Sequence, residues 1–225
     1  MHLKCFVILT TMMVGNVSVA QTPQACRLFE TETEFVSQTL HMQMENTRHV
    51  LNIPKIYFED LFDRVDGSEH NAQLFRVMVN DFAPVTRRQT TDLLQYGNRP
   101  YFDFLLHDPI DLDESLGIIA TRMATGDGRD LNAYDIEPST FGLSVLLPKS
   151  GSEVHRDVFV AYDQLGSLSA IVSCRPWGTT LHSSCTHDFR SGEIDVRMSY
   201  SREYLPQWND LQASVSDFIA CSLID

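Results

Sequence analysis

The number and spacing of its cysteines constrain the fold of this chain more than any other feature of its sequence. The chain has five cysteines, and Cys5 lies inside an N-terminal segment that we expect to be removed. The other four form an even set in the remaining chain: Cys26, Cys174, Cys185 and Cys221. An even number of cysteines in an exported protein predicts two disulfide bonds, for which four cysteines allow three pairings. The fold must therefore bring these positions together in pairs.

Residues 1–20 have the three-part pattern of a secretory signal peptide. Lys4 gives the start a positive charge, an apolar run follows over 5–14, and the segment ends on small residues at Ser18 and Ala20. This order predicts cleavage after Ala20 and a mature protein that is periplasmic or secreted. The apolar run is shorter than the roughly 20 residues that span a bilayer, so we expect no membrane anchor.

Among the three pairings, we favour Cys174–Cys185 together with Cys26–Cys221. Ten residues separate Cys174 from Cys185, and they include a proline and a glycine, as in a loop between neighbouring strands. The second bond would join the start of the mature chain to its last predicted helix. On the chain-entropy model, closing so long a loop stabilises the folded state by about 4–5 kcal/mol.

The last third of the chain has the pattern of an antiparallel meander followed by a helix. Short alternating or apolar runs between turn residues predict strands at 141–147, 154–162, 168–174, 183–189 and 194–200. Pro206 begins a predicted helix, in which apolar residues recur every three or four positions at Leu211, Val215, Phe218 and Ile219. We therefore predict an α+β fold: an antiparallel β-sheet meander with a C-terminal amphipathic helix packed on one face, cross-linked by disulfides.

The first half gives weaker patterns. Residues 51–58 and 72–79 are strand-like and flank the turn signal Asp66-Gly67, so we expect them to pair as a hairpin. Residues 116–123 also have a strand pattern, whereas 125–139 have the composition of a loop. These patterns divide the chain into a signal peptide at 1–20, an N-terminal half at 21–100 and a C-terminal sheet and helix at 101–225, unless 21–225 forms one domain.

The chain is strongly acidic, which narrows the choice of partner. Seventeen Lys and Arg residues against 30 Asp and Glu residues give a net charge of -13. This balance argues against nucleic acid and anionic membranes and favours a basic protein partner. We expect the binding residues in two acidic stretches and at Trp177 on the predicted disulfide loop; the acidic residues are Asp103, Asp108, Asp111, Asp113, Glu114, Asp127, Asp130 and Asp135.

No sequence motif predicts catalysis or a bound cofactor. The segment 142–146 lacks the second glycine of a serine nucleophile elbow, and no His-Glu-x-x-His pair is present. Cys185 with His187 lacks the second ligand pair of a zinc site, so we expect no metal. The acidic stretches do not follow the ligand spacing of a twelve-residue calcium loop, although calcium stays an alternative.

Several short segments resemble those of uncharacterised exported proteobacterial proteins, in the same order along the chain. The segments are Asn52-Ile53-Pro54-Lys55 with Tyr57, Val79-Asn80-Asp81-Phe82 with Pro84, Phe141-Gly142-Leu143, Asp157-Val158-Phe159-Val160, Ile171 with Cys174, Cys185 with His187 and Phe189, and Tyr204-Leu205 with Trp208. Some proteins of this type accompany secreted antibacterial toxins as periplasmic immunity proteins. The resemblance implies a similar role here but assigns no binding residue.

The sequence thus favours a periplasmic binding protein without catalysis, an immunity-type inhibitor that neutralises a secreted antibacterial toxin or hydrolase. Two alternatives stay open: an exported hydrolase assisted by calcium, and an envelope adaptor subunit of a secretion system. Export, the predicted disulfides and the strong acidity are compatible with each of these three functions.

We expect an intact-mass measurement of the exported protein to show a chain that begins at Gln21 and lacks four hydrogens relative to its reduced form. Each disulfide bond removes two hydrogens, so a deficit of four reports two bonds. Retention of residues 1–20 would contradict the signal-peptide prediction, and free thiols would contradict the disulfide prediction.

Overall fold

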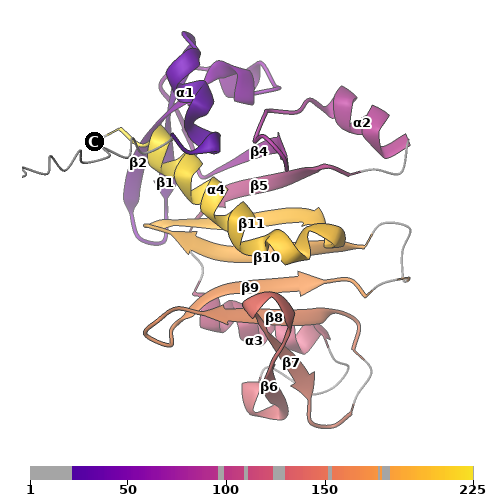
Figure 1. The fold of residues 1–225 in the computed structure, drawn as a ribbon. Coiled ribbons are helices and arrows are strands. Elements are labelled where there is room, and N and C mark those ends of the chain that lie inside the picture. Colours follow the sequence, from indigo (N-terminus) through magenta and orange to yellow (C-terminus); the bar gives the residue numbers. More distant parts are fainter. Residues whose placement is uncertain are drawn as a thin grey trace, which may run out of the picture.

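The computed structural model describes residues 22–95, 99–108, 111–123, 130–151, 154–176, 178 and 183–224. Within this part of the chain the fold is α+β, with two β-sheets and helices on both faces of the larger sheet (Figure 1). The strands are β1 (Phe35–Met42), β2 (Thr47–Pro54), β3 (Ser68–His70), β4 (Ala72–Met78), β5 (Tyr101–His107), β6 (Tyr134–Pro138), β7 (Ser144–Pro148), β8 (Asp157–Tyr162), β9 (Leu168–Cys174), β10 (Ser184–Ser191) and β11 (Ile194–Ser201). The α-helices are α1 (Arg27–Thr31), α2 (Arg87–Gln95), α3 (Leu112–Met123) and α4 (Trp208–Ser222).

The larger sheet has eight strands in the order β4-β5-β11-β10-β9-β8-β7-β6, and all of its neighbouring pairs are antiparallel. Strands β7 to β11 follow one another in chain order across this sheet, which confirms the predicted meander. Strands β4 and β5 extend the sheet beyond β11 (Figure 1). One sheet therefore contains strands from both sides of residue 100.

Helix α4 covers one face of the larger sheet, as its apolar stripe predicts. The α-helix begins at Trp208, and Pro206 lies in a 3-10 helix that precedes it. The four residues of the predicted stripe are all buried: Leu211, Val215, Phe218 and Ile219. Figure 1 shows α4 crossing β10 and β11 toward the N-terminal elements. The predicted packing of a C-terminal amphipathic helix on the sheet is therefore confirmed.

The predicted pairing of 51–58 with 72–79 is wrong. Strand β2 pairs with β1 in the smaller sheet, whose order is β2-β1-β3, whereas β4 pairs with β5 in the larger one. The missing partner was β1, whose side chains alternate between partly exposed and buried along all eight residues. Because polar residues occupy the outward positions of β1, the strand is hard to recognise in the sequence. Its inward apolar residues Val36, Leu40 and Met42 are buried in the core.

Two further predictions on the middle of the chain are corrected. Residues 116–123 belong to helix α3, because Leu116, Ala120 and Met123 are spaced by three and four residues and form one buried stripe. This helix packs on β8 and β9, on the face opposite α4 (Figure 1). The segment predicted as a loop at 125–139 contains the edge strand β6 over its last part.

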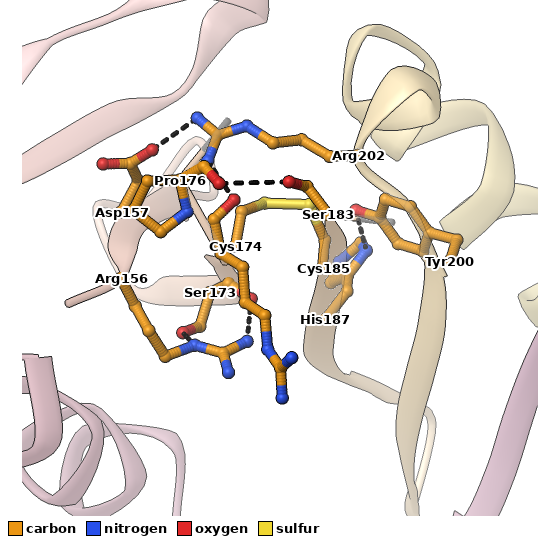
Figure 2. The surroundings of a disulfide bond; sticks show 11 residues. Arg156, Asp157, Ser173, Cys174, Pro176, Ser183, Cys185, His187, Tyr200 and Arg202 are labelled. Atoms are coloured by element: carbon orange, nitrogen blue, oxygen red, sulfur yellow. Dashed lines mark hydrogen bonds and ion pairs between the residues drawn. A yellow bond between two sulfur atoms is a disulfide. The ribbon is translucent and has the colours of Figure 1, made fainter. Parts of the chain in front are cut away.

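Both predicted disulfides are present. Cys26 and Cys221 join the segment before α1 to the last turn of α4, with their Cα atoms 5.9 Å apart. Cys174 and Cys185 lie directly opposite each other on β9 and β10. Figure 2 shows this second bond beside Tyr200. The prediction that these two cysteines flank a connection between neighbouring strands is therefore confirmed.

We expect the double variant Cys26→Ala/Cys221→Ala to lose about 5 kcal/mol of unfolding free energy, and Cys174→Ala/Cys185→Ala about 3 kcal/mol. The chain-entropy model ties the loss to loop length, and the sequence separations are 195 and 11 residues. Denaturant titration of the two variants measures the difference. Equal losses would show that local packing, and not loop closure, sets the contribution of each bond.

The imidazole of His187, on β10, is fully buried in the core beneath α4. Its Nε2 lies 3.0 Å from Gln212 Oε1, and its Nδ1 lies 3.5 Å from the Tyr200 hydroxyl. The Trp208 ring packs against the imidazole at 5.8 Å between centroids. Burial lowers the pKa of His187 to about 3, and the hydrogen bond to Gln212 only partly opposes this effect. The imidazole is therefore neutral in the folded protein.

This burial predicts a loss of stability in acid. Above pH 6.5 the imidazole is neutral in both the folded and the unfolded chain, so its contribution is complete. Below pH 6.5 only the unfolded chain takes up the proton, and the unfolding free energy should fall by up to about 1.4 kcal/mol per pH unit until the pH approaches 3. Thermal unfolding from pH 7 to pH 4 checks this, with His187→Gln, which cannot titrate, as the control. An unchanged slope in the variant would assign the acid sensitivity to other groups.

Candidate protein-binding face

The larger sheet leaves part of one face partly exposed. The face opposite α4 is covered by α3 at β8 and β9, while β4, β5, β11 and β10 present alternating polar residues there. We call this surface the open face. It consists of Leu74, Arg76, Asp103, Leu105, Thr186, Asp188, Arg190, Asp195, Arg197 and Ser199. About half of the Leu74 surface (53 %) is exposed.

Strand register places an arginine opposite an aspartate in three successive rows of the open face. Arg76 pairs with Asp103 across β4 and β5, with Nε and Oδ1 2.5 Å apart. Arg197 and Asp188 form the next row, 2.6 Å apart, and Arg190 and Asp195 form the third, 2.9 Å apart. Opposite charges on directly facing strand positions stabilise a sheet, which accounts for this arrangement.

Arg99 and Tyr101 extend the first row. The guanidinium of Arg99 lies 3.4 Å from the second carboxylate oxygen of Asp103. The ring of Tyr101 packs against both guanidinium groups, at 5.9 Å from Arg76 and 5.4 Å from Arg99. These contacts hold the long arginine side chains in defined positions. A partner would therefore meet ordered donors, at a smaller entropic cost than free arginines would carry.

The open face ends at an acidic cleft of about 680 Å³. Its charged lining comes from the β1–β2 turn, the start of α3, the β8–β9 turn and the end of β10, through Glu45, Asp111, Asp113, Asp163 and Arg190. Arg190 is already engaged by Glu45 at 2.7 Å and by Asp195 at 2.9 Å. Among the described residues, Asp111, Asp113 and Asp163 have no ion-pair partner. The cleft is therefore a region of negative potential.

Some of these acidic groups also stabilise the local structure. Asp111 Oδ1 accepts a hydrogen bond from the backbone N–H of Glu114 at the start of α3, as a helix N-cap does. Asp113 and Glu114 lie in the first turn of this helix, where the helix dipole favours negative charge. Asp163 Oδ1 accepts from the backbone of Leu165 and Ser167 in the β8–β9 turn. Among the described residues, Asp113 is thus the acidic group of the cleft whose side chain accepts no hydrogen bond.

The residues predicted from sequence fall in several places. Asp111 and Asp113 line the cleft, and Asp108 accepts a hydrogen bond from the backbone of Met44, which also lines it. Asp103 lies within the ion pairs of the open face. Asp130 caps the turn at Leu131–Ala133, and Asp135 lies on the edge strand β6, 3.6 Å from Lys149. Asp127 and Trp177 lie outside the described residues.

Sequence reasoning missed the basic half of this surface and two acidic groups of the cleft. Arg76 and Arg197 lie on strands that come together only in three dimensions, and Arg99 lies just before β5. Glu45 and Asp163 come from separate turns. Alternation along each strand shows that these side chains point outward. Only the β4-β5-β11-β10 order shows that they share one surface.

The arrangement offers charge and hydrogen bonds to a binding partner. Among the described residues, no group of three His, Cys, Asp or Glu side chains is placed to hold a metal ion. In the same part of the chain, no helix is long and apolar enough to cross a membrane. Two disulfides are typical of an exported protein.

Comparison with known proteins shows which fold this is. No protein-family model and no curated protein sequence matches the chain. An immunity protein of the Stenotrophomonas maltophilia type IV secretion system is similar in structure, with a TM-score of 0.61 and 14 % identity over 84 % of this chain and 94 % of that one. An iron-regulated outer membrane lipoprotein of Neisseria meningitidis aligns with a TM-score of 0.49 and 12 % identity, over 84 % and 92 % of the two chains. At 14 % identity, the first likeness establishes a shared fold.

Proposed function

We propose that this protein is an exported, periplasmic binding protein of the immunity type, which neutralises a secreted toxin or hydrolase by binding to it. The observation that carries the proposal is the fold shared with the Stenotrophomonas maltophilia immunity protein, which extends over most of both chains. A fold alone does not define a function, so the surface has to supply the rest of the argument.

The acidic cleft and the open face supply that argument. Three unpaired carboxylates in the cleft create a negative potential that attracts a basic protein and raises its association rate. The ion-paired arginines beside the cleft are rich in the donors that protein interfaces use. Cleft and open face meet at Arg190, so one partner can contact both.

The function is tested by isolating the partner and reconstituting the pair. The tagged protein is purified from the organism that encodes it, the bound protein is identified, and the two purified proteins are mixed. We expect a stable complex that weakens as salt is added, and rescue of growth when both genes are expressed together. The absence of a complex at low salt, or of any rescue, would refute the proposal.

Within that complex, we expect Asp113→Lys to lower the association rate roughly tenfold at low ionic strength, because it reverses a charge in the cleft. Asp135→Lys makes the same charge change on β6, away from the cleft, and should alter the rate less than twofold. Stopped-flow association at several salt concentrations measures both variants. An equal effect of the two would show that net charge alone, and not the cleft, attracts the partner.

A further inference from the structure

The most exposed pair of neighbouring apolar side chains lies away from the cleft, between β2 and β3. Leu61 and Phe62 are 74 % and 84 % exposed, at the tip of the segment 58–66. We call these two residues the apolar knob. Exposing a large aromatic side chain to water is unfavourable, and a soluble protein gains nothing from it in isolation. The knob is therefore a candidate for contact with another molecule.

Hydrogen bonds hold the segment that carries the knob in one conformation. Asp60 accepts from the backbone of Phe62 through Oδ1 at 3.0 Å and from the backbone of Asp63 through its carbonyl at 3.2 Å. The Arg64 guanidinium donates twice to the carbonyl of Phe58, at 2.9 and 2.6 Å. The buried amide of Gln38 donates to the carbonyl of Asp63 at 2.6 Å. These hydrogen bonds hold the backbone on both sides of Leu61 and Phe62.

The base of the segment is anchored in the core. Phe58 is buried, and its ring packs against Phe75 of β4 with centroids 5.6 Å apart. Phe62 lies only four residues further along the chain and is almost fully exposed. An exposed aromatic side chain on a backbone that is already held in place loses little backbone freedom when it is buried in an interface. This lowers the entropic cost of using it as an interface hot spot.

A groove joins the segment that carries the knob to the open face. It lies beside the edge strand β4 and is lined in part by Asp60, Asp63 and Leu74. Leu74 belongs to the open face and is about half exposed. A partner that contacts the knob segment can therefore also reach the edge of the open face.

Charge indicates what kind of partner fits the knob. The segment 59–69 contains five acidic residues and one arginine, Arg64. Glu59 faces Arg87 at 3.5 Å and Glu69 faces Arg48 at 3.6 Å. Within the described residues, the acidic groups of this segment outside any ion pair are Asp60, Asp63 and Asp66. The charge of Arg64 is directed inward, toward the carbonyl of Phe58. An apolar centre with an acidic rim is complementary to an apolar pocket with a basic rim.

We infer that the apolar knob, Leu61 and Phe62, enters an apolar pocket on a basic partner protein. The acidic groups around the knob, Asp63 foremost, then pair with Lys or Arg side chains at the rim of that pocket. The inference rests on the proposed function, because the partner is the toxin or hydrolase that the protein neutralises. It adds a second contact region and predicts where the largest share of the binding energy lies.

The chain offers a matched control for the apolar knob. Ile136 is 46 % exposed on the edge strand β6, away from the cleft and between two acidic residues, Asp135 and Glu137. It is a single apolar residue between charged ones along its strand, whereas the knob has two adjacent apolar residues. Loss of an exposed apolar side chain is therefore the same change at both positions. Only the surroundings differ.

The test measures the affinity of the purified partner, identified as described above, for Phe62→Ser and Ile136→Ser. We expect Phe62→Ser to raise the dissociation constant at least about 30-fold, as loss of a hot-spot side chain does, and Ile136→Ser less than twofold. Phe62→Trp should keep most of the affinity, because it retains a large aromatic side chain. Asp63→Lys should slow association roughly fivefold at low salt and less at high salt. The melting temperatures of all four variants should match the wild type, since these side chains are exposed.

The possible results separate the inference from the proposed function. If the wild-type complex forms but Phe62→Ser binds as tightly as the wild type, the inference that the knob enters a pocket is refuted, while the proposed function stands. Equal weakening by Phe62→Ser and Ile136→Ser also refutes binding through the knob, because it shows a general effect of surface hydrophobicity. If the wild-type chain forms no complex with any protein, both proposals fail.

Discussion

The packing around Phe218 of α4 is the interaction on which the rest of this structure depends. Its ring is fully buried and lies 5.0–5.6 Å from the rings of Phe29, Tyr57, Phe75, Phe82 and Phe104. These five residues come from segments that are distant in the sequence, including α1, β4 and β5. Each aromatic pair contributes about 0.5–1.5 kcal/mol beyond the area it buries, and here several share one centre. Without this cluster, the smaller sheet and the segment 58–66 would lose their attachment to the larger sheet.

Patterns along the chain were sufficient where neighbouring elements pair. The meander from β7 to β11 and the helix after Pro206 follow from alternation, turns and a three-to-four spacing, and the structure has them all. The cysteine pairs were predictable for related reasons. One pair lies on neighbouring strands that are close in the sequence, and the other joins the segment before α1 to the last turn of α4.

The same patterns gave wrong predictions where strands distant in the sequence pair, and where a short apolar run fits both the strand and the helix period. Strand β4 pairs with β5, which follows a long connection, so no local signal opposed its assignment to a hairpin with 51–58. In α3, a short apolar run is compatible with both strand and helix, and the N-cap at Asp111 was the signal that favours helix. The residues of the open face come together only because strands that are distant in the sequence pair. Asp103 was predicted because it lies in an acidic stretch, whereas no pattern in the sequence singled out the arginines.

The bond between Cys26 and Cys221 has a consequence for how the protein responds to proteolysis. It closes nearly all the described residues into one covalent ring, because residues 27–220 lie between its two cysteines. A single proteolytic cut anywhere in that stretch opens the ring but leaves both fragments linked. The fragments can then stay packed around Phe218. The protein can thus take a first cleavage without separating into two pieces.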